Sequence, residues 1–428
     1  MALQEAVNVV RTSLAEQGSE DNLRIFQMAS AGDREAIAES REIIQSILEQ
    51  EMVYLEGKPP QEQAAEMIRR SAWGLGQLED LYADPTVDEI TVLMNGKVFV
   101  CRRGKNEPTD LVVDPAEIGR LIEIMIPFNE MGNSASLTQS NSILELVRGD
   151  MNRLTAMGPP VIKGRFFVLR KRDTVKKTPE SLIALKTIDE RAWKALQLLV
   201  RGRRNTLISG GTNSGKTTLL EILTGELPAN LNVRIIDTDT EADVARLYPD
   251  RNIIPLEAHP EAGANMQRLF EGTLRTSPDV IIVAEFRGIG EAIQAIRACL
   301  SGHAGSMATT FYSSPEDAIR GIAMMMIDEG MNLTPELAME RVAKAFNVIV
   351  QMIASRDRYG VKKIKSITEV QTKGSEIVYR ELVRWVPSTS DYMGEGSWAI
   401  MNRPSPEMCQ SMNEFGVMEE EIRDAFAV

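Results

Sequence analysis

The stretch "SGGTNSGKTTLL", residues 209–220, decides the fold class of this 428-residue chain. It satisfies the pattern G-x-x-x-x-G-K-[ST], a loop whose backbone N–H groups can surround a phosphate. A short apolar segment, "NTLIS" (205–209), precedes it, and a helical pattern, "TTLLEILTGELP" (217–228), follows it and ends before Pro228. This strand–loop–helix context makes a purely structural glycine-rich turn the weaker alternative. We therefore predict a nucleotide-binding α/β domain.

Each residue type in this loop has a physical reason to be there. Glycines allow the tight turn, and the helix that follows adds partial positive charge at its first turn. Lys216 can reach the β- and γ-phosphates, and Thr217 can ligate Mg²⁺. We expect the phosphate-binding residues to be Gly210, Gly211, Thr212, Asn213, Ser214, Gly215, Lys216, Thr217 and Thr218.

A second motif, "SPDVIIVAEFRGIGEA" (277–292), supplies a candidate catalytic group. Its apolar run, residues 280–284, predicts a buried strand that ends in Glu285. A glutamate there can orient or deprotonate an attacking water and can help to hold the metal. A small kinase needs no such group, so Glu285 indicates ATP hydrolysis. The structural alternative is that Glu285 only caps the next helix.

Between these motifs in the sequence lies "VRIIDTDTEAD" (233–243), a strand pattern that runs into a group of carboxylates. A strand inserted between the phosphate-binding strand and the glutamate strand is typical of RecA-like motors. Asp239 and Glu241 are candidates to position water or metal near the γ-phosphate. The alternative is a solvated acidic loop.

Arginines complete the set of candidate residues. Negative charge that develops on the γ-phosphate favours a guanidinium group supplied by a neighbouring domain or subunit. Such arginines occur around the glutamate strand and in the preceding domain: Arg268, Arg275 and Arg287, then Arg153, Arg165 and Arg170.

Changes in residue composition and periodicity along the chain predict four regions. Residues 1–73 form a helical arm with an excess of acidic residues, either solvated or used for docking. Residues 74–172 form a small α+β domain with a hairpin turn at Asn95-Gly96. Residues 173–187 form a charged linker. Residues 188–428 form the α/β domain, in which strands alternate with helices, and a C-terminal extension.

Composition narrows the class of protein further. A formal net charge of −13 lowers the expectation of nucleic-acid binding, although "RFFVLRKRDTVKK" (165–177) is basic and suits a linker or a surface between subunits. The three cysteines form neither a disulfide framework nor a zinc pattern. The chain shows no signal peptide and no apolar run long enough to span a membrane. A cytoplasmic protein is the simplest interpretation.

These motifs together resemble the traffic ATPases of type II and type IV secretion systems, in particular the tight-adherence pilus and VirB-type branches. The resemblance covers nearly the whole chain from about Gly74, and "RRNTLISGGTNSGKTTLL" and "LRTSPDVIIVAEFRGIGEA" match most closely. It places Arg275, Glu285 and Arg287 at expected catalytic positions. It places Asp239 at the catalytic position of an acidic motif, with Glu241 as the alternative.

A histidine motif extends the resemblance. "GHAGSMATTFYSS" (302–314) has His303 at the first histidine position of the family, where it could sense nucleotide, and Phe311 where a second histidine is usual. Because phenylalanine cannot hydrogen-bond to a phosphate, part of the γ-phosphate sensing is missing or passes to Thr309, Thr310 or Tyr312.

The resemblance implies a fold and a function that composition alone does not. It implies a RecA-like P-loop ATPase domain preceded by a small α+β, PAS-like domain, with ATP and Mg²⁺ bound between the two and contacted by Arg153 and Arg170. It implies a homo-hexamer on the inner face of the cytoplasmic membrane, held there by platform proteins and without sequence-specific nucleic-acid binding. The expected function is to power secretion, pilus assembly or conjugative transfer. The alternatives are a nucleic-acid motor and a nucleotide-binding assembly subunit with little turnover.

Overall fold

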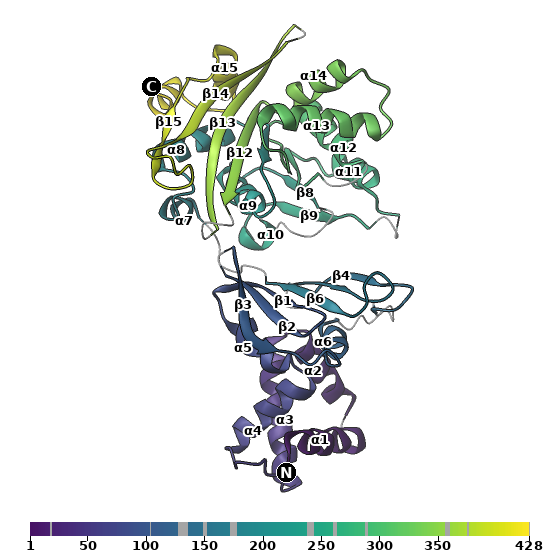
Figure 1. The fold of residues 1–428 in the computed structure, drawn as a ribbon. Helices are drawn as coiled ribbons and strands as arrows, with labels where there is room; N and C mark the ends of the chain where they lie inside the picture. Colours follow the sequence, from purple (N-terminus) through teal and green to yellow (C-terminus); the bar gives the residue numbers. More distant parts are fainter. Residues whose placement is uncertain are drawn as a thin grey trace. The chain divides into compact units, whose positions relative to one another are not determined.

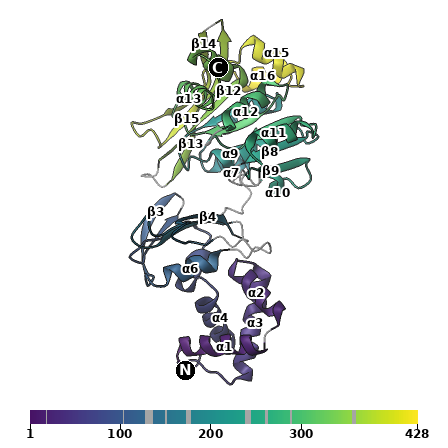
Figure 2. The ribbon, with the colours of Figure 1, turned by 90° about the vertical axis from the view of Figure 1, so that its right-hand side faces the viewer.

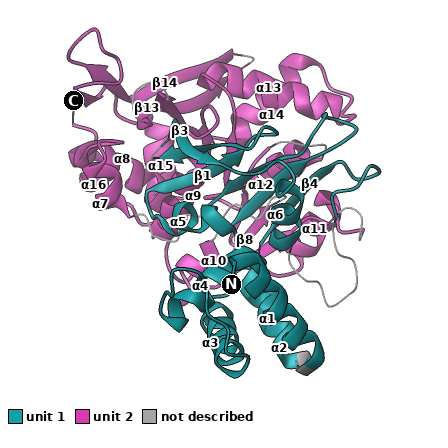
Figure 3. Cartoon of the chain, turned by 60° about the horizontal axis from the view of Figure 1, so that its bottom comes forward, with its two compact units in different colours: residues 1–174 teal, residues 175–428 magenta. Residues whose placement is uncertain are grey.

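A computed structural model describes residues 1–17, 19–102, 104–126, 136–148, 152–171, 178–237, 244–259, 263–286, 290–355, 360–374 and 376–427. The chain divides into two compact units, residues 1–174 and residues 175–428 (Figure 3). Each unit has its own apolar core, so each is described by itself. In the part of the chain that the structure describes, no helix is both long enough and apolar enough to cross a membrane.

Unit 1 begins with the predicted helical arm. Its helices are α1 (Leu3–Gln17), α2 (Glu20–Ser30), α3 (Arg34–Gln50) and α4 (Gln61–Ala72). Helix α3 begins after Asp33, whose carboxylate accepts the backbone N–H of Ala36 at 2.9 Å, as an N-cap residue does. Helices α2 and α4 both pack against α3, and Figure 2 shows α2 and α3 side by side. Their apolar faces bury Ile44, Leu48 and Ile68 completely.

The rest of unit 1 is an antiparallel sheet with the order β3-β2-β1-β6-β5-β4. The strands are β1 (Val87–Val92), β2 (Lys97–Arg102), β3 (Lys105–Val112), β4 (Ile143–Val147), β5 (Arg153–Met157) and β6 (Phe166–Arg170). The helical segments are η1 (Gly76–Leu78), α5 (Glu79–Ala83) and α6 (Ile118–Met125). The predicted hairpin turn joins β1 to β2. Gly96 has φ +80° there, and an added Cβ would lie 1.8 Å from the Val113 carbonyl oxygen, so the turn requires glycine.

Unit 2 contains a larger sheet with the order β15-β14-β13-β12-β7-β11-β10-β8-β9. Figure 1 shows its strands β12, β13 and β14 side by side. The strands are β7 (Thr206–Ser209), β8 (Val233–Asp237), β9 (Ile253–Glu257), β10 (Val280–Val283), β11 (Met307–Thr310), β12 (Val348–Ser355), β13 (Val361–Lys373), β14 (Glu376–Pro387) and β15 (Gly396–Ile400). From β12 to β9 the neighbouring strands are parallel, as the sequence predicted. Strands β13, β14 and β15 extend the sheet in antiparallel fashion.

The strand order corrects one expectation. The strand at 233–237 comes between the two motifs in the sequence, but in the sheet the strand between β7 and β10 is β11. Strand β8 pairs with the other side of β10. Helical crossovers can skip positions in a parallel sheet, so the order along the chain does not determine the order in the sheet. On this side of the P-loop strand, the neighbouring segment is therefore the one that leads into Phe311, and β12 lies on the other side.

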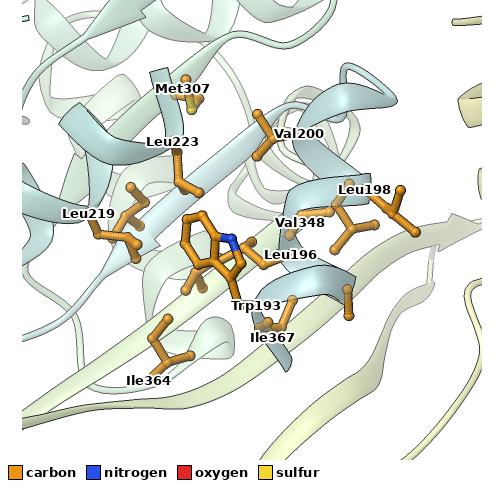
Figure 4. Close-up of a cluster of buried hydrophobic side chains, with 14 of the residues drawn as sticks. Trp193, Leu196, Leu198, Val200, Leu219, Leu223, Met307, Val348, Ile364 and Ile367 are labelled. Carbon is orange, nitrogen blue, oxygen red and sulfur yellow. The ribbon is translucent and has the colours of Figure 1, made fainter. Parts of the chain in front are cut away.

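Helices cover both faces of this sheet, so its central strands are buried throughout and rich in apolar residues. The helices are α7 (Pro179–Ala184), α8 (Glu190–Arg201), α9 (Lys216–Glu226), α10 (Val244–Leu247), α11 (Met266–Leu274), α12 (Glu291–Leu300), α13 (Pro315–Asp328), α14 (Pro335–Ala345), α15 (Pro406–Glu414) and α16 (Glu419–Ala425). Ile208 packs in the core of α8 and α9, and its neighbour Leu207 packs in the core of α11–α14. Figure 4 shows the first of these cores around Trp193.

The predicted linker, residues 173–187, is only partly a connecting segment. Residues 172–177 lie outside the described residues. Thr178 caps helix α7, and Leu182 of α7 is buried in the core of unit 2. The residues from Pro179 onward therefore belong to the fold of unit 2.

Candidate nucleotide-binding site

The P-loop connects the carboxyl end of β7 to the first turn of α9. The backbone N–H of Gly210 donates to the carbonyl oxygen of Thr310 at 3.1 Å, which fixes the start of the loop against β11. An added Cβ on Gly210 would lie 2.7 Å from the Ser214 hydroxyl and 2.8 Å from the Met352 carbonyl oxygen, so only glycine fits. Gly215 has φ +93° and begins helix α9. These contacts explain why the sequence needs glycine at both positions.

Lys216 is buried, with 6% of the residue exposed, although lysine is almost never buried without partners. Its Nζ donates to the carbonyl oxygens of Gly210 at 3.0 Å and Gly211 at 3.1 Å. The same Nζ lies 3.9 Å from the centroid of the Phe311 ring. The ammonium group is therefore held inside the loop by two carbonyl groups and one aromatic face.

Two buried hydroxyl groups beside the loop fit a polar ligand. Ser214 Oγ and Thr310 Oγ1 are inaccessible to solvent and have no hydrogen-bond partner among the residues that the structure describes. Buried polar groups are nearly always hydrogen-bonded in folded proteins, so each such group calls for an explanation. Together with the buried ammonium of Lys216 and the N-terminus of α9, they suit the phosphate groups of a nucleotide.

Glu285 stands at the same edge of the sheet as the P-loop. It follows β10 and is 9% exposed. Phe286 N–H donates to the Thr309 carbonyl oxygen at 3.1 Å, and Thr309 Oγ1 donates to the Ala284 carbonyl oxygen at 2.6 Å. The residues on both sides of Glu285 are thus bound to β11, which lies next to β7. With strands about 4.8 Å apart, this places the backbone of Glu285 roughly 10 Å from the end of β7.

Of the acidic segment at residues 233–243, the structure describes residues 233–237. Asp237 is the buried last residue of β8, at the same carboxyl edge of the sheet. Asp239 and Glu241 lie outside the described residues, as does Arg287. Their predicted roles stay predictions.

The structure does not bring Arg275 and His303 to the P-loop of the same unit. Arg275 is the exposed C-cap residue of α11 and precedes β10. His303 precedes β11, and its Nδ1 lies 3.1 Å from the Pro278 carbonyl oxygen. Because β7, β10 and β11 are parallel, residues just before these strands lie at the opposite edge of the sheet from the P-loop. Sequence proximity to the two motifs does not reveal this separation.

The remaining arginines predicted from the sequence lie in helix α11 and in unit 1. Arg268 lies in the first turn of α11, and its Nη1 donates to the Gly263 carbonyl oxygen at 3.4 Å. Arg153 and Arg170 belong to unit 1 and are opposite each other in the pairing of β5 with β6. Arg165, also in unit 1, has its guanidinium group against Gly119. A role for Arg153 and Arg170 in nucleotide binding stays a prediction.

Of the three residues expected to replace the missing histidine, Thr310 has the most suitable hydroxyl. The Thr309 hydroxyl already donates to Ala284. The Tyr312 ring packs on α13, where an added Cβ at Gly321 would lie 2.0 Å from a ring carbon. Thr310 Oγ1 is buried and has no hydrogen-bond partner among the described residues, and the Thr310 carbonyl oxygen accepts from the loop at Gly210.

Sequence reasoning missed two residues at the loop. In the sequence Phe311 is only a departure from the histidine motif, yet its ring faces Lys216. Lys362, in β13, has its Nζ 3.9 Å from the point that a Cβ of Gly215 would occupy. Neither contact has a sequence signal, because both residues lie far from the P-loop along the chain.

The fold and the site define a class of protein. A glycine-rich loop between a buried parallel strand and a helix, with a buried lysine inside the loop and a buried glutamate at the same sheet edge, is the site of a P-loop nucleotide-binding protein.

Comparison with known proteins gives the family. The family described as "Type II/IV secretion system protein" matches residues 132–382, more than half of the chain. The chain belongs to this family. Membership confirms the predicted family. The mostly parallel sheet with helices on both faces confirms the predicted α/β class.

The chain is also similar to individual relatives and to solved structures. The conjugal transfer protein TrbB of Rhizobium radiobacter is 26% identical over 314 residues, which cover 71% of this chain and 90% of that protein. The type IV secretion system protein PtlH of Bordetella pertussis is 30% identical over 180 residues, which cover 40% of this chain and 52% of that protein. Among solved structures, the chain is similar to the ATPase DotB of Legionella pneumophila, with 16% identity, a TM-score of 0.48, and coverage of 81% of this chain and 84% of that one.

Proposed function

We propose that this chain is a Mg²⁺-dependent ATPase that works as a homo-hexamer and powers secretion, pilus assembly or conjugative transfer. The observation that carries the proposal is the buried Lys216 inside a P-loop whose sheet edge also holds Glu285. An ammonium group placed there can bind phosphates, and a carboxylate there can activate water. A protein that only binds nucleotide needs the first group but not the second.

The residues at this edge suit ATP and Mg²⁺. Lys216 would hold the β- and γ-phosphates, with the N–H groups of residues 210–218 around them. The Thr217 hydroxyl and the Glu285 carboxylate are oxygen ligands of the kind that Mg²⁺ prefers. The metal would neutralise charge that develops on the phosphates. Glu285 would orient the attacking water and accept its proton, with Asp239 or Glu241 assisting.

The arginines support the proposal of a hexamer. Arg275 and His303 lie at the edge of the sheet away from the P-loop of their own unit. A guanidinium group for the γ-phosphate is therefore assigned to Arg287, to unit 1 through Arg153 and Arg170, or to a neighbouring subunit. In a ring each nucleotide would meet groups from two subunits.

The proposed place of work is the inner face of the cytoplasmic membrane, reached through membrane-embedded platform proteins. Two observations support it. The described residues contain no membrane-spanning helix. The names of the relatives place them in conjugal transfer and type IV secretion.

A pair of substitutions tests the proposal. We expect Lys216→Ala to abolish ATP binding and Glu285→Gln to keep ATP binding but lower turnover at least 100-fold, because only the second leaves the phosphate contacts intact. Binding is measured by calorimetry and turnover by phosphate release. Lys344→Ala and Glu336→Gln, on exposed positions of α14, are the matched controls.

The outcomes separate the alternatives. Full turnover in Glu285→Gln contradicts the role of Glu285. A wild-type protein that binds ATP but does not hydrolyse it is an assembly subunit rather than a motor. Stimulation of turnover by DNA that disappears at high salt favours a nucleic-acid motor.

A further inference from the structure

The residues before and after Phe311 are both hydrogen-bonded to the P-loop or to its strand. The carbonyl oxygen of the residue before it, Thr310, accepts the N–H of Gly210 at 3.1 Å. The carbonyl oxygen of the residue after it, Tyr312, accepts from Ser209 Oγ at 2.8 Å and Gln351 Nε2 at 3.0 Å. The ring of Phe311 therefore starts from a backbone that is attached to the very strand from which the loop emerges.

The ring meets the lysine at the distance of a strong cation–π contact. Lys216 Nζ lies 3.9 Å from the ring centroid, well inside the limit of about 6 Å for such contacts. The lysine is buried, and a cation–π contact is stronger when water is excluded from the ammonium group. Two N–H bonds of Nζ point to loop carbonyl groups, so the ring and the carbonyl groups together restrict where the charge can be.

We infer that Phe311 is a positioning residue for the P-loop lysine: its ring holds the ammonium of Lys216 in the loop before the nucleotide arrives. Such preorganisation strengthens binding because less ordering remains to be done when the phosphates enter. This inference rests on the proposed binding of nucleotide at this loop. It gives Phe311 a contribution that does not need a hydrogen bond to phosphate.

The inference distinguishes Phe311 from a γ-phosphate sensor. Lys216 acts on phosphate groups that ATP shares in part with ADP, so a residue acting through Lys216 affects the binding of both nucleotides. A side chain that senses the γ-phosphate affects ATP alone. The ratio of the two affinities therefore separates the roles.

Progressive fluorination of the Phe311 ring is the most direct experiment. Mono-, di- and trifluorophenylalanine at position 311 withdraw negative charge from the ring face while the shape changes little. We expect the Kd for ADP, measured by calorimetry on the full chain, to rise with each fluorine and to reach about three- to tenfold above wild type. Unchanged melting temperatures confirm that each variant is folded. A Kd that does not vary along the series overturns the inference.

Natural substitutions give a second, independent measurement. Phe311→Tyr keeps an aromatic face and is expected to bind ADP like wild type, whereas Phe311→Leu keeps an apolar side chain and is expected to bind about three- to tenfold more weakly. The loss should appear with ADP as well as with ATP measured in EDTA, where no hydrolysis occurs. A loss confined to ATP, or tighter binding by Phe311→Leu, contradicts positioning through Lys216.

The wild-type protein distinguishes this inference from the proposed function. If wild type binds neither ADP nor ATP, the proposed function fails and the inference fails with it. If wild type binds both and the Phe311 variants match it, only the inference fails.

Discussion

Lys362 brings a second ammonium group to the P-loop. It is half-buried, and its Nζ lies 3.9 Å from the position of a Cβ on Gly215, where helix α9 begins. A positive charge at that point attracts phosphates over a short range that salt screens. We predict that Lys362→Met weakens the binding of ADP and ATP by about three- to tenfold and reduces the salt dependence of Kd.

The measurement is Kd at low and high salt, with Lys373→Met as the control. Lys373 is an exposed residue at the other end of the same strand. If both variants bind nucleotide like wild type at every salt concentration, Lys362 has no part in the site.

At the residue scale, the sequence predicts site residues where the signal is local. The glycines, Lys216 and Thr217 share one contiguous motif, and Glu285 ends an apolar run that can only be a buried strand. Phe311 and Lys362 are brought to the loop by strands β11 and β13 of the sheet. No local sequence pattern predicts these contacts. Arg275 and His303 are close to the motifs in sequence, yet they lie across the sheet from the P-loop of their own unit, and their predicted roles stay predictions.

At the scale of elements, Asn205 connects the start of β7 to three other segments. Its Nδ2 donates to the Ala345 carbonyl oxygen at 2.9 Å, at the end of α14, and to that of Cys299 in α12. Its Oδ1 accepts the N–H groups of Gly305 at 2.9 Å and Ser306 at 3.1 Å, just before β11. One buried amide side chain therefore sets where β11 and two helices meet the P-loop strand.

We predict that Asn205→Ala lowers the free energy of unfolding of unit 2 by about 2–4 kcal/mol, because four backbone hydrogen bonds, three of them buried, are lost. Chemical denaturation measures the change. The control is Asn413→Ala, an exposed residue of α15 that donates one hydrogen bond, to the Val417 carbonyl oxygen, and should cost less than about 1 kcal/mol. Equal losses in the two variants would show that the Asn205 bonds contribute little.

The elements themselves were predictable, but their order was not. Alternating apolar and helical patterns identify parallel strands, and an Asn-Gly pair identifies the hairpin of β1 and β2. The position of β11 between β7 and β10 depends on which crossover packs best against the whole sheet. That choice involves every strand at once, so no local pattern contains it.

At the scale of the whole molecule, the two units have separate cores and only unit 2 contains the P-loop. We predict two unfolding transitions in calorimetry, of which ADP shifts one. At 100 times Kd a ligand stabilises its unit by about 2.7 kcal/mol, which corresponds to roughly 5–10 °C for a unit of this size. Lys216→Ala should abolish the shift and leave the other transition unchanged. A single transition that ADP moves as a whole would mean that the units unfold together.

The length of β13 has a mechanical consequence. This strand begins next to the P-loop, where Lys362 lies, and continues to Lys373, with one register shift in its pairing with β12 and one in its pairing with β14. At about 3.3 Å per residue its thirteen residues span roughly 40 Å, and pairing with β12 and β14 on its two sides stiffens it. Such a strand can transmit a rotation at one end as a displacement at the other end. A tilt of only about 3° at the loop would move the far turn by roughly 2 Å, so a small change around a phosphate can be delivered as a displacement on the opposite side of unit 2.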